Sequence, residues 1–172
     1  MNLIEFLFIA KGEVLLDNLL IILIMIQIPF KKLDKNAVIP EFKHFDDAGK
    51  DLIAVSYNYN EKYDRHEYGL GFATAIPEGY YIKIAPRSSN TKTNLYLPNG
   101  EGTIDAGYRG EWKVFYKSRD KGGDKEYNVG DAIAQCFLCK RPDWEFIEVD
   151  ELDNTDRGAD GGINRDDINF KV

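Results

Sequence analysis

Apolar residues from position 25 onwards occur in short runs rich in Val, Ile, Tyr and Phe, and Gly, Asn, Asp and Pro separate these runs. Runs of this kind, bounded by turn-forming residues, are typical of β-strands. Turns are predicted at Pro77-Glu78-Gly79 and Pro98-Asn99-Gly100. We see neither an internal repeat nor a long helix, so the pattern predicts an all-β sandwich or barrel. The expected strands span 25–33, 52–59, 69–76, 80–85, 94–97, 111–116, 132–138 and 144–149.

The first 24 residues follow a different pattern. Residues 3–10 and 19–28 are almost wholly apolar, and charged residues at positions 11, 13 and 17 lie between them. Neither run reaches the ~18–20 residues that a membrane-spanning helix needs, and a secretory signal would require a basic start and a cleavage site. We interpret residues 1–24 as an extension that is not part of the domain, for example one translated from an upstream start codon. The alternative is a short amphipathic helix or membrane anchor.

The chain of 172 residues is long enough for one domain with its own core. We place this domain at residues 25–152 and interpret residues 153–172, rich in Asp, Asn and Gly, as a flexible tail. The net charge of −7 argues against long nucleic acid as a partner, because such binding needs a basic surface. We do not expect a membrane partner either. A small polyanion can still bind where Arg, backbone amides or Mg²⁺ neutralise its charge.

The two cysteines, Cys136 and Cys139, lie in one apolar run that we expect to be a strand. Residues i and i+3 of a strand point to opposite faces. One metal ion or one local disulfide would therefore not suit this pair, and we interpret both as buried core thiols.

The stretch from Gly102 to Glu111, Gly-Thr-Ile-Asp-Ala-Gly-Tyr-Arg-Gly-Glu, carries the most distinctive chemistry. Its carboxylate, Asp105, precedes the ring of Tyr108 by three residues, and glycines surround the pair. This spacing predicts a tight β-hairpin that holds an acid and an apolar ring over one small pocket. A carboxylate beside a bound phosphate can act as a general base on water, and the ring can pack against a sugar. The alternatives are a turn acid at Asp105 and an ordinary strand aromatic at Tyr108.

Five segments in order, Asp47–Leu52, Pro86–Ser89, Asn99–Glu111, Gly130–Gln135 and Arg157–Gly162, resemble the trimeric deoxyuridine triphosphatases, or dUTPases. The resemblance covers about residues 25–162. It implies a single domain with a distorted jelly-roll fold of the β-clip type, a homotrimer, and active sites built between subunits. It also implies Mg²⁺-dependent hydrolysis of dUTP to dUMP and pyrophosphate in the cytoplasm, or in the host cytoplasm if the source is a virus or phage.

The resemblance assigns the nucleoside contacts residue by residue. Asp105 matches the general base that activates water for attack at the α-phosphorus, and Tyr108 matches the ring that packs on deoxyribose and excludes ribonucleotides. Asn99 and the backbone of Gly102, Thr103 and Ile104 match the hairpin that recognises uracil. Lys113, on the returning strand, is expected to add a backbone contact.

The resemblance also assigns the phosphate contacts. Arg87, Ser88 and Ser89 match the phosphate-binding segment, although many relatives have Gly in place of Ser89. Gln135 matches a polar contact on the phosphate side. Asp51 matches the acid that reaches Mg²⁺ through water, and a plain surface Asp is the alternative.

The fifth segment departs from the family pattern. Arg157, Gly158 and Gly161 match it, and we expect this tail to close over the nucleotide of a neighbouring subunit. The family usually continues with an aromatic that stacks on uracil and with Ser and Thr that bind the γ-phosphate. Residues 162–166 are Gly-Ile-Asn-Arg-Asp instead, which predicts a working but weaker closure.

Two other functions compete with this one. A deoxycytidine triphosphate deaminase shares the fold, but that family carries a catalytic Glu where this chain has Phe115, which cannot transfer protons. A dUTPase-like regulator with little hydrolysis is the second alternative, suggested by the altered tail and the apolar N-terminus. The intact pairing of Asp105 with Tyr108 favours the enzyme, because a site kept only for binding has no need of a base there.

Overall fold

The computed structural model describes residues 25–120, 127–156 and 158. Within these residues the chain forms ten strands and one short 3-10 helix, η1. The elements in order are β1 (Phe30–Lys32), β2 (Lys50–Ile53), β3 (Ser56–Asn60), β4 (Arg65–Gly69), β5 (Phe72–Thr74), β6 (Tyr80–Pro86), η1 (Ser88–Lys92), β7 (Leu95–Tyr96), β8 (Gly102–Ile104), β9 (Lys113–Ser118) and β10 (Ala132–Lys140).

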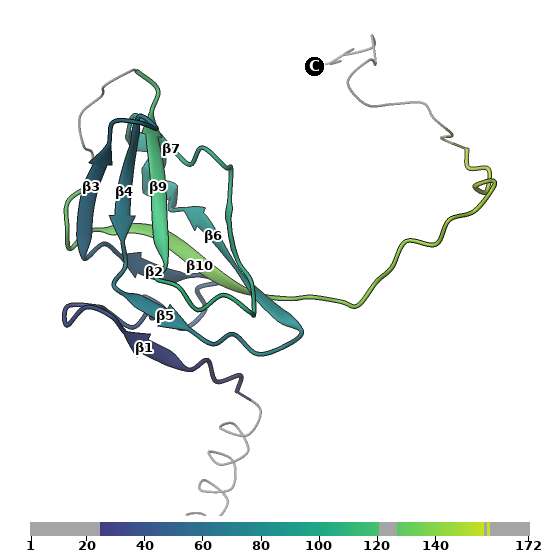
Figure 1. Cartoon of the computed structure of the whole chain (residues 1–172), viewed down its shortest axis with the longest axis horizontal. Coiled ribbons are helices and arrows are strands. Elements are labelled where there is room, and N and C mark those ends of the chain that lie inside the picture. The colour runs from purple at the N-terminus through teal and green to yellow at the C-terminus, as the bar shows by residue number, and fades with distance from the viewer. Residues whose placement is uncertain (1–24, 121–126, 157, 159–172) are drawn as a thin grey trace, which may run out of the picture. The chain divides into compact units, whose positions relative to one another are not determined.

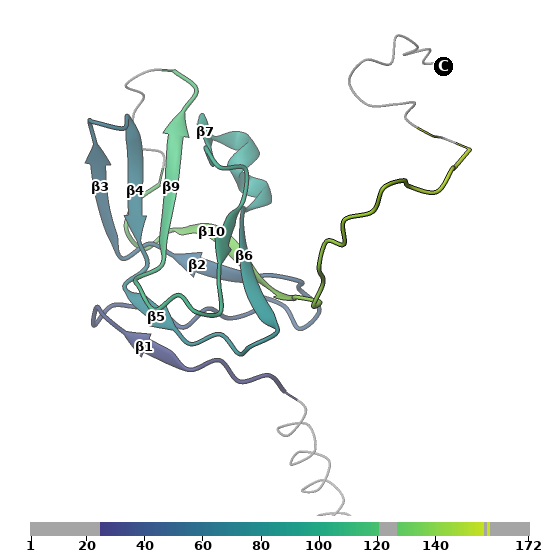
Figure 2. The same ribbon diagram turned by 45° about the vertical axis from the view of Figure 1, so that its right-hand side comes forward.

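The strands build two four-stranded sheets and one strand pair, all of them antiparallel (Figures 1 and 2). One large sheet has the order β2-β10-β6-β8, and the other has the order β3-β4-β9-β7. The pair β1-β5 completes the fold. The expectation of an all-β domain is confirmed, and no described helix has the length and apolar character that crossing a bilayer would require.

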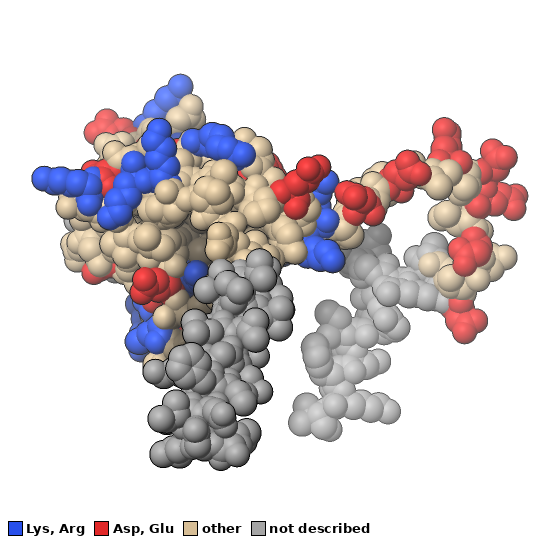
Figure 3. Space-filling view, turned by 90° about the horizontal axis from the view of Figure 1, so that it is seen from below, with Lys and Arg blue, Asp and Glu red and all other residues tan. Residues whose placement is uncertain are grey.

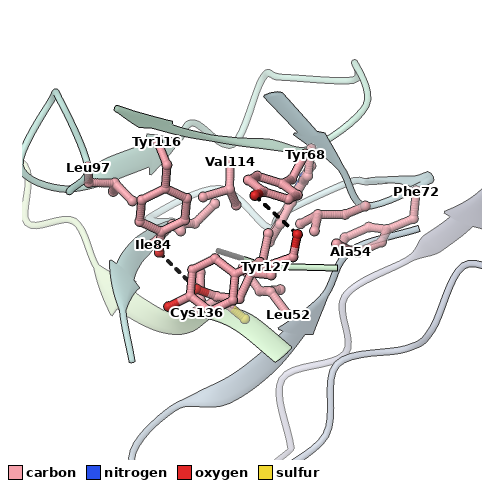
Figure 4. Close-up of a cluster of buried hydrophobic side chains, with 14 of the residues drawn as sticks. Leu52, Ala54, Tyr68, Phe72, Ile84, Leu97, Val114, Tyr116, Tyr127 and Cys136 are labelled. Carbon is pink, nitrogen blue, oxygen red and sulfur yellow. Dashed lines mark hydrogen bonds between the residues drawn. The ribbon is translucent and has the colours of Figure 1, made fainter. Parts of the chain in front are cut away.

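The core lies between the two large sheets and includes the buried tyrosines Tyr68, Tyr116 and Tyr127 (Figure 4). Tyr68 and Tyr116 are fully buried, and each keeps a partner for its hydroxyl. Tyr68 donates to the carbonyl of Tyr127 at 3.4 Å, and Tyr116 donates to the carbonyl of Ile133 at 2.8 Å. Burial raises the pKa of both phenols, so both remain donors at neutral pH. These bonds satisfy polar atoms that would otherwise be costly to bury.

The predicted strand 52–59 is in fact two strands that belong to different sheets. β2 ends at Ile53 and β3 begins at Ser56. Between them, the backbone amide of Ala54 donates to Asp131 at 3.1 Å, and that of Val55 donates to Gly69 at 2.9 Å. The chain thus crosses from one large sheet to the other without a turn-forming residue, which is why its apolar pattern does not reveal the break.

Two other predicted strands also differ from the observed ones. The run 69–76 contains the end of β4 and all of β5, with Leu70 and Gly71 between them, and the rest of β4 was not predicted. Only Phe30–Lys32 of the run 25–33 is a strand. The predicted turns at 77–79 and 98–100 are confirmed, and Gly79 and Gly100 adopt positive φ values of 80° and 73°.

Gly71 combines a left-handed backbone with a crowded site. Its φ is +69°, and an added Cβ would lie 2.7 Å from Cγ2 of Val55 and 2.8 Å from Cβ of Asp34. We expect Gly71→Ala to lower the free energy of unfolding by about 2–4 kcal/mol, from backbone strain plus steric overlap. Gly79→Ala is the matched control, because Gly79 has a similar φ but open space around it. Denaturant unfolding of both variants measures the difference in the free energy of unfolding. Equal decreases in the two variants would show that steric overlap at Gly71 contributes nothing.

The two cysteines lie on opposite faces of β10, as the spacing predicts. Cys136 is buried in the core, and its burial raises the pKa of the thiol to about 11. Cys139 is only partly buried. The interpretation of both as buried thiols is therefore correct for Cys136 and wrong for Cys139, because the outer face of this sheet is less covered than the inner one.

The chain divides after Pro142 into two compact units. The described part of the second unit, residues 143–156 and 158, contains no strand, so the predicted strand 144–149 is wrong. A strand needs a paired edge, and none is present along these described residues. Trp144 and Phe146 pack edge to face with their ring centroids 4.7 Å apart. Acidic side chains are frequent in the described part of this unit, namely Asp143, Glu145, Glu148, Asp150, Glu151, Asp153 and Asp156. Figure 3 draws Asp and Glu side chains in red.

Candidate functional site

A pocket of about 300 Å³ opens where β8 and β9 approach the end of β6. It brings together every residue predicted to contact the nucleoside. These residues are Asn99, Gly102, Thr103, Ile104, Asp105, Tyr108 and Lys113.

The segment that carries Asp105 and Tyr108 is not the tight hairpin that its glycines predict. β8 pairs with β6, with Thr103 opposite Lys83. β9 pairs with β4 and β7 instead of β8. Residues 105–112 therefore link the two large sheets, and the pocket lies between strands of different sheets. Local sequence shows that a turn occurs here, but strand partners far along the chain decide what the turn connects.

Asp105 is exposed at the end of β8. Its backbone carbonyl accepts the amide of Tyr108 at 3.0 Å, which closes the turn. No hydrogen bond or ion pair to the described residues engages its carboxylate, so the turn is closed by the backbone and leaves the side chain available to the pocket. This geometry favours a chemical role over the alternative of a capping acid.

Tyr108 lines the pocket with its ring folded back over the following residues. Its hydroxyl donates to the carbonyl of Glu111 at 3.1 Å, and the side chain is 44% exposed. An added Cβ on Gly110 would overlap the hydroxyl and would lie 2.6 Å from Cζ of the ring. Glycine at position 110 therefore permits this placement of the ring.

Five further residues line the pocket that were not predicted to contact the nucleoside, namely Ile84, Leu97, Glu111, Val114 and Phe115. Ile84, Leu97 and Val114 belong to the core, so their apolar character gave no functional indication. Oε1 of Glu111 accepts the amide of Gly71 at 3.0 Å, and its Oε2 lies 3.6 Å from Nζ of Lys113. Glu111 ends the segment Asn99–Glu111, and its place in that segment is the sequence feature that could have indicated it.

Position 115, where the deaminase alternative requires a glutamate, is occupied by an aromatic ring with a cation above it. The guanidinium of Arg65 lies 4.0 Å from the ring centroid of Phe115. No proton-transferring group occupies this position, and the structure gives the deaminase hypothesis no support.

Arg87, Asp51 and Gln135 form a second group, which we call the Arg87 cluster. Nε of Arg87 donates to Oδ1 of Asp51 at 3.0 Å, and Nη1 donates to the carbonyl of Ala132 at 3.2 Å. Nε2 of Gln135 donates to the same Oδ1 at 3.2 Å. The three side chains lie outside the lining of the pocket.

A bulge in β10 builds this cluster. The register between β10 and β2 shifts between Ala132 and Ala134, after which Gln135 stands directly opposite Asp51. Directly opposite residues on antiparallel strands have neighbouring side chains. Arg87 follows the last residue of β6, which pairs with the other edge of β10. Three segments far apart in the sequence therefore meet through one strand.

The two serines of the predicted phosphate segment start η1. Ser88 and Ser89 are exposed, and Arg87 precedes them in an extended conformation. No side chain caps the first turn of η1. The segment thus presents one guanidinium and two hydroxyls beside each other, a combination suited to phosphate oxygens.

The two carboxylate oxygens of Asp51, the predicted magnesium ligand, have different surroundings. Among the described residues no group of three or more acidic, His or Cys side chains could hold a metal ion. Mg²⁺ typically uses one or two carboxylates plus substrate phosphates and water. Both hydrogen bonds to the Asp51 carboxylate end on Oδ1. Oδ2 accepts none from the described residues and is suited to a water ligand of the ion.

The fifth segment is described only in part. Arg157 and Gly161 lie outside the described residues. Gly158 has a positive φ of 50°, and its amide donates to the carbonyl and hydroxyl of Thr155 at 3.0 and 3.1 Å. These bonds form a local turn within the second unit.

Comparison with known protein families matches residues 35–164 to the dUTPase family. A deoxyuridine 5'-triphosphate nucleotidohydrolase from Thermobifida fusca is 34% identical over 88% of this chain and 86% of its own length. One from Nocardia farcinica is 40% identical over 78% of this chain and 82% of its own length.

Solved structures show the same likeness. A dUTPase variant from Staphylococcus bacteriophage 80alpha, solved with dUpNHpp, superposes with a TM-score of 0.66 at 26% identity, covering 80% of this chain and 97% of that one. A dUTPase variant from phage phi11 of S. aureus, with a structural Mg(II) ion, gives a TM-score of 0.61 at 26% identity, covering 74% and 99%. With the pocket and the Arg87 cluster described above, these matches show that the chain belongs to the dUTPase family.

Proposed function

We propose that this protein hydrolyses dUTP to dUMP and pyrophosphate. The observation that carries the proposal is the pocket in which Asp105, Tyr108, Asn99 and the backbone of β8 lie together. The relatives named deoxyuridine 5'-triphosphate nucleotidohydrolase support it.

In this mechanism Asp105 accepts a proton from a water molecule as the water oxygen attacks the α-phosphorus. The new bond joins the water oxygen to phosphorus, the bond to the bridging oxygen breaks, and pyrophosphate leaves. Because the carboxylate is exposed and unengaged by described side chains, it can reach a water at the mouth of the pocket. Positioned general bases typically contribute about 10²–10⁴-fold to the rate.

Uracil is selected by the backbone in this proposal. Residues 102–104 line the pocket from β8, which is the edge strand of its sheet, so backbone groups on its unpaired side are available to a base. The amide of Asn99 offers both a donor and an acceptor. The backbone of Lys113, on β9, adds a contact from the opposite side. A close-fitting backbone edge leaves no space for the methyl group of thymine.

The phosphate chain is bound by Arg87, Ser88, Ser89 and Gln135. Since the Arg87 cluster lies outside the pocket lining in the single chain, we infer that one subunit supplies the pocket and another supplies the cluster. This arrangement requires a homotrimer with sites between subunits. Mg²⁺ bound on the triphosphate, with Asp51 holding one of its waters, would neutralise charge on the leaving group. Arg157, Gly158 and Gly161 would close over the phosphates.

Exclusion of ribonucleotides depends on where the ring of Tyr108 lies. We expect Gly110→Ala to displace this ring, because the new Cβ would overlap it, and to reduce the preference for dUTP over UTP about tenfold. Gly107→Ala is the matched control, since an added Cβ there meets nothing within 4 Å. The ratio of kcat/KM values for the two nucleotides is the measurement, and an unchanged ratio in Gly110→Ala would refute this role of Tyr108.

One assay tests the proposal as a whole. The wild-type protein is incubated with dUTP and Mg²⁺, with and without EDTA, and pyrophosphate is measured. We expect turnover at ordinary enzyme rates of about 1–10³ s⁻¹ with the ion and little without it. Absence of pyrophosphate would favour the regulator alternative. In a parallel incubation with dCTP in place of dUTP, release of ammonia would favour the deaminase.

A further inference from the structure

The turn that presents Arg87, Ser88 and Ser89 is fixed from the inside by one side chain, that of Asn90. Its backbone amide donates to the carbonyl of Arg87 at 2.9 Å. Its side-chain Nδ2 donates to the carbonyl of Leu95 at 2.9 Å. The Thr93 hydroxyl shares its one proton between the carbonyl oxygen of Asn90 at 2.9 Å and its Oδ1 at 3.2 Å. Asn90 therefore joins the phosphate segment to the start of β7.

The Oδ1 atom of Asn90 also has a partner in the core, the hydroxyl of Tyr127. This hydroxyl donates to Asn90 at 2.9 Å. The ring of Tyr127 is only 8% exposed and lies 5.5 Å from the ring of Tyr116 and 6.2 Å from that of Tyr68, between centroids (Figure 4). A rigidly packed ring thus holds a turn whose two serines are exposed and whose first residue lacks a side-chain cap.

We propose that Asn90 and Tyr127 are positioning residues for triphosphate binding. Neither touches the nucleotide. Through the hydrogen bond between them, the core holds Arg87, Ser88 and Ser89 in the orientation that phosphate oxygens require. The inference rests on the proposed dUTP hydrolysis and adds residues that act through the phosphate segment. Small displacements of such groups are costly, because binding and catalysis depend on preset geometry.

Tyr127→Phe tests this proposal, because it keeps the packed ring and removes only the hydroxyl. Tyr57→Phe is the matched control, since it also removes one phenol hydroxyl, which lies on β3 and bonds Nδ1 of His66 at 3.1 Å. Two probes separate the halves of the site: deoxyuridine, followed by NMR titration, occupies only the pocket, and the imido analogue dUpNHpp also needs the phosphate segment. Asn90→Ala, which removes the whole side-chain junction, is the second variant.

We expect Tyr127→Phe to weaken dUpNHpp binding about threefold to tenfold, the effect of one hydrogen bond, and to raise KM for dUTP more than it lowers kcat. Asn90→Ala should weaken dUpNHpp binding more than Tyr127→Phe does. The affinity for deoxyuridine should change less than twofold in both variants. Tyr57→Phe should leave the affinities for both probes unchanged. An equal loss of affinity for the two probes, or no loss of affinity for dUpNHpp, would refute the positioning role of Asn90 and Tyr127. If the wild-type protein bound neither probe, the proposed dUTP hydrolysis itself would be refuted, and the positioning role that rests on it would fall too.

Discussion

Asp105→Asn is expected to reduce kcat for dUTP hydrolysis by about 10²–10⁴-fold, because an amide cannot accept the proton of the attacking water. The side chain is exposed and makes no bond to the described residues. Its replacement by an isosteric amide therefore should not disturb the fold. We expect the melting temperature to shift by less than about 2 °C, in line with a surface substitution. The measurements are steady-state kinetics with Mg²⁺ and thermal unfolding.

Glu101→Gln is the matched control for this variant. Glu101 lies four residues before Asp105, is also exposed, and forms an ion pair with Nζ of Lys83 at 3.1 Å. The hydrogen bond and charge of Glu101 raise the pKa of Lys83. Glu101→Gln therefore removes one negative charge, as Asp105→Asn does, but at a carboxylate that is already paired with Lys83. It should retain nearly full activity. If Asp105→Asn kept more than a tenth of wild-type kcat while binding dUpNHpp normally, Asp105 would not be the base.

Arg87→Ala is expected to lower kcat/KM for dUTP about 100-fold. A guanidinium donates charge-assisted hydrogen bonds to phosphate oxygens, each worth roughly 1.5–3 kcal/mol. In the described structure Nε and Nη1 hold Asp51 and the carbonyl of Ala132, so Arg87 also orients the acid that we assign to the magnesium water. Affinity for deoxyuridine should stay within twofold of the wild-type value, since the cluster lies outside the pocket.

Two further variants sharpen this test. Arg87→Lys keeps the charge but loses the planar fork, and we expect an intermediate loss. Arg119→Ala removes an exposed positive charge after the end of β9 and controls for net charge alone. If Arg87→Ala and Arg119→Ala reduced kcat/KM equally, the effect would be long-range electrostatics, and the phosphate-binding role of Arg87 would be refuted.

The two groups of site residues behave differently in these tests because different parts of the fold hold them. The pocket is held by β6, β8 and β9 and by the short turn after Asp105. The Arg87 cluster is held by β2, β6 and β10. Apart from the proposed base Asp105, variants of the pocket residues should change the selection of uracil and deoxyribose. Variants of the Arg87 cluster should change the binding of the phosphates.

The sequence alone predicted the all-β class, the turns at Gly79 and Gly100, and the nucleoside residues later found in one pocket. These features depend on local chemistry, since turn residues and a run such as Gly102–Glu111 carry their preferences wherever the chain places them. The same locality explains the errors. The chain enters a second sheet at Ala54 and Val55 within an unbroken apolar pattern, and residues 144–149 have the composition of a strand without a paired edge.

Only the tertiary structure decided which strands pair, and strand pairing built the rest of the site. The glycine-rich turn connects two sheets because β8 bonds to β6 and β9 bonds to β4. Gln135 meets Asp51 because a one-residue bulge shifts the register of β10. The hydroxyl of Tyr127 reaches Asn90 across 37 positions of sequence. Hydrogen-bonded partners in a sheet are chosen by burial over the whole domain, so contacts of this kind cannot be derived from the residues that flank them.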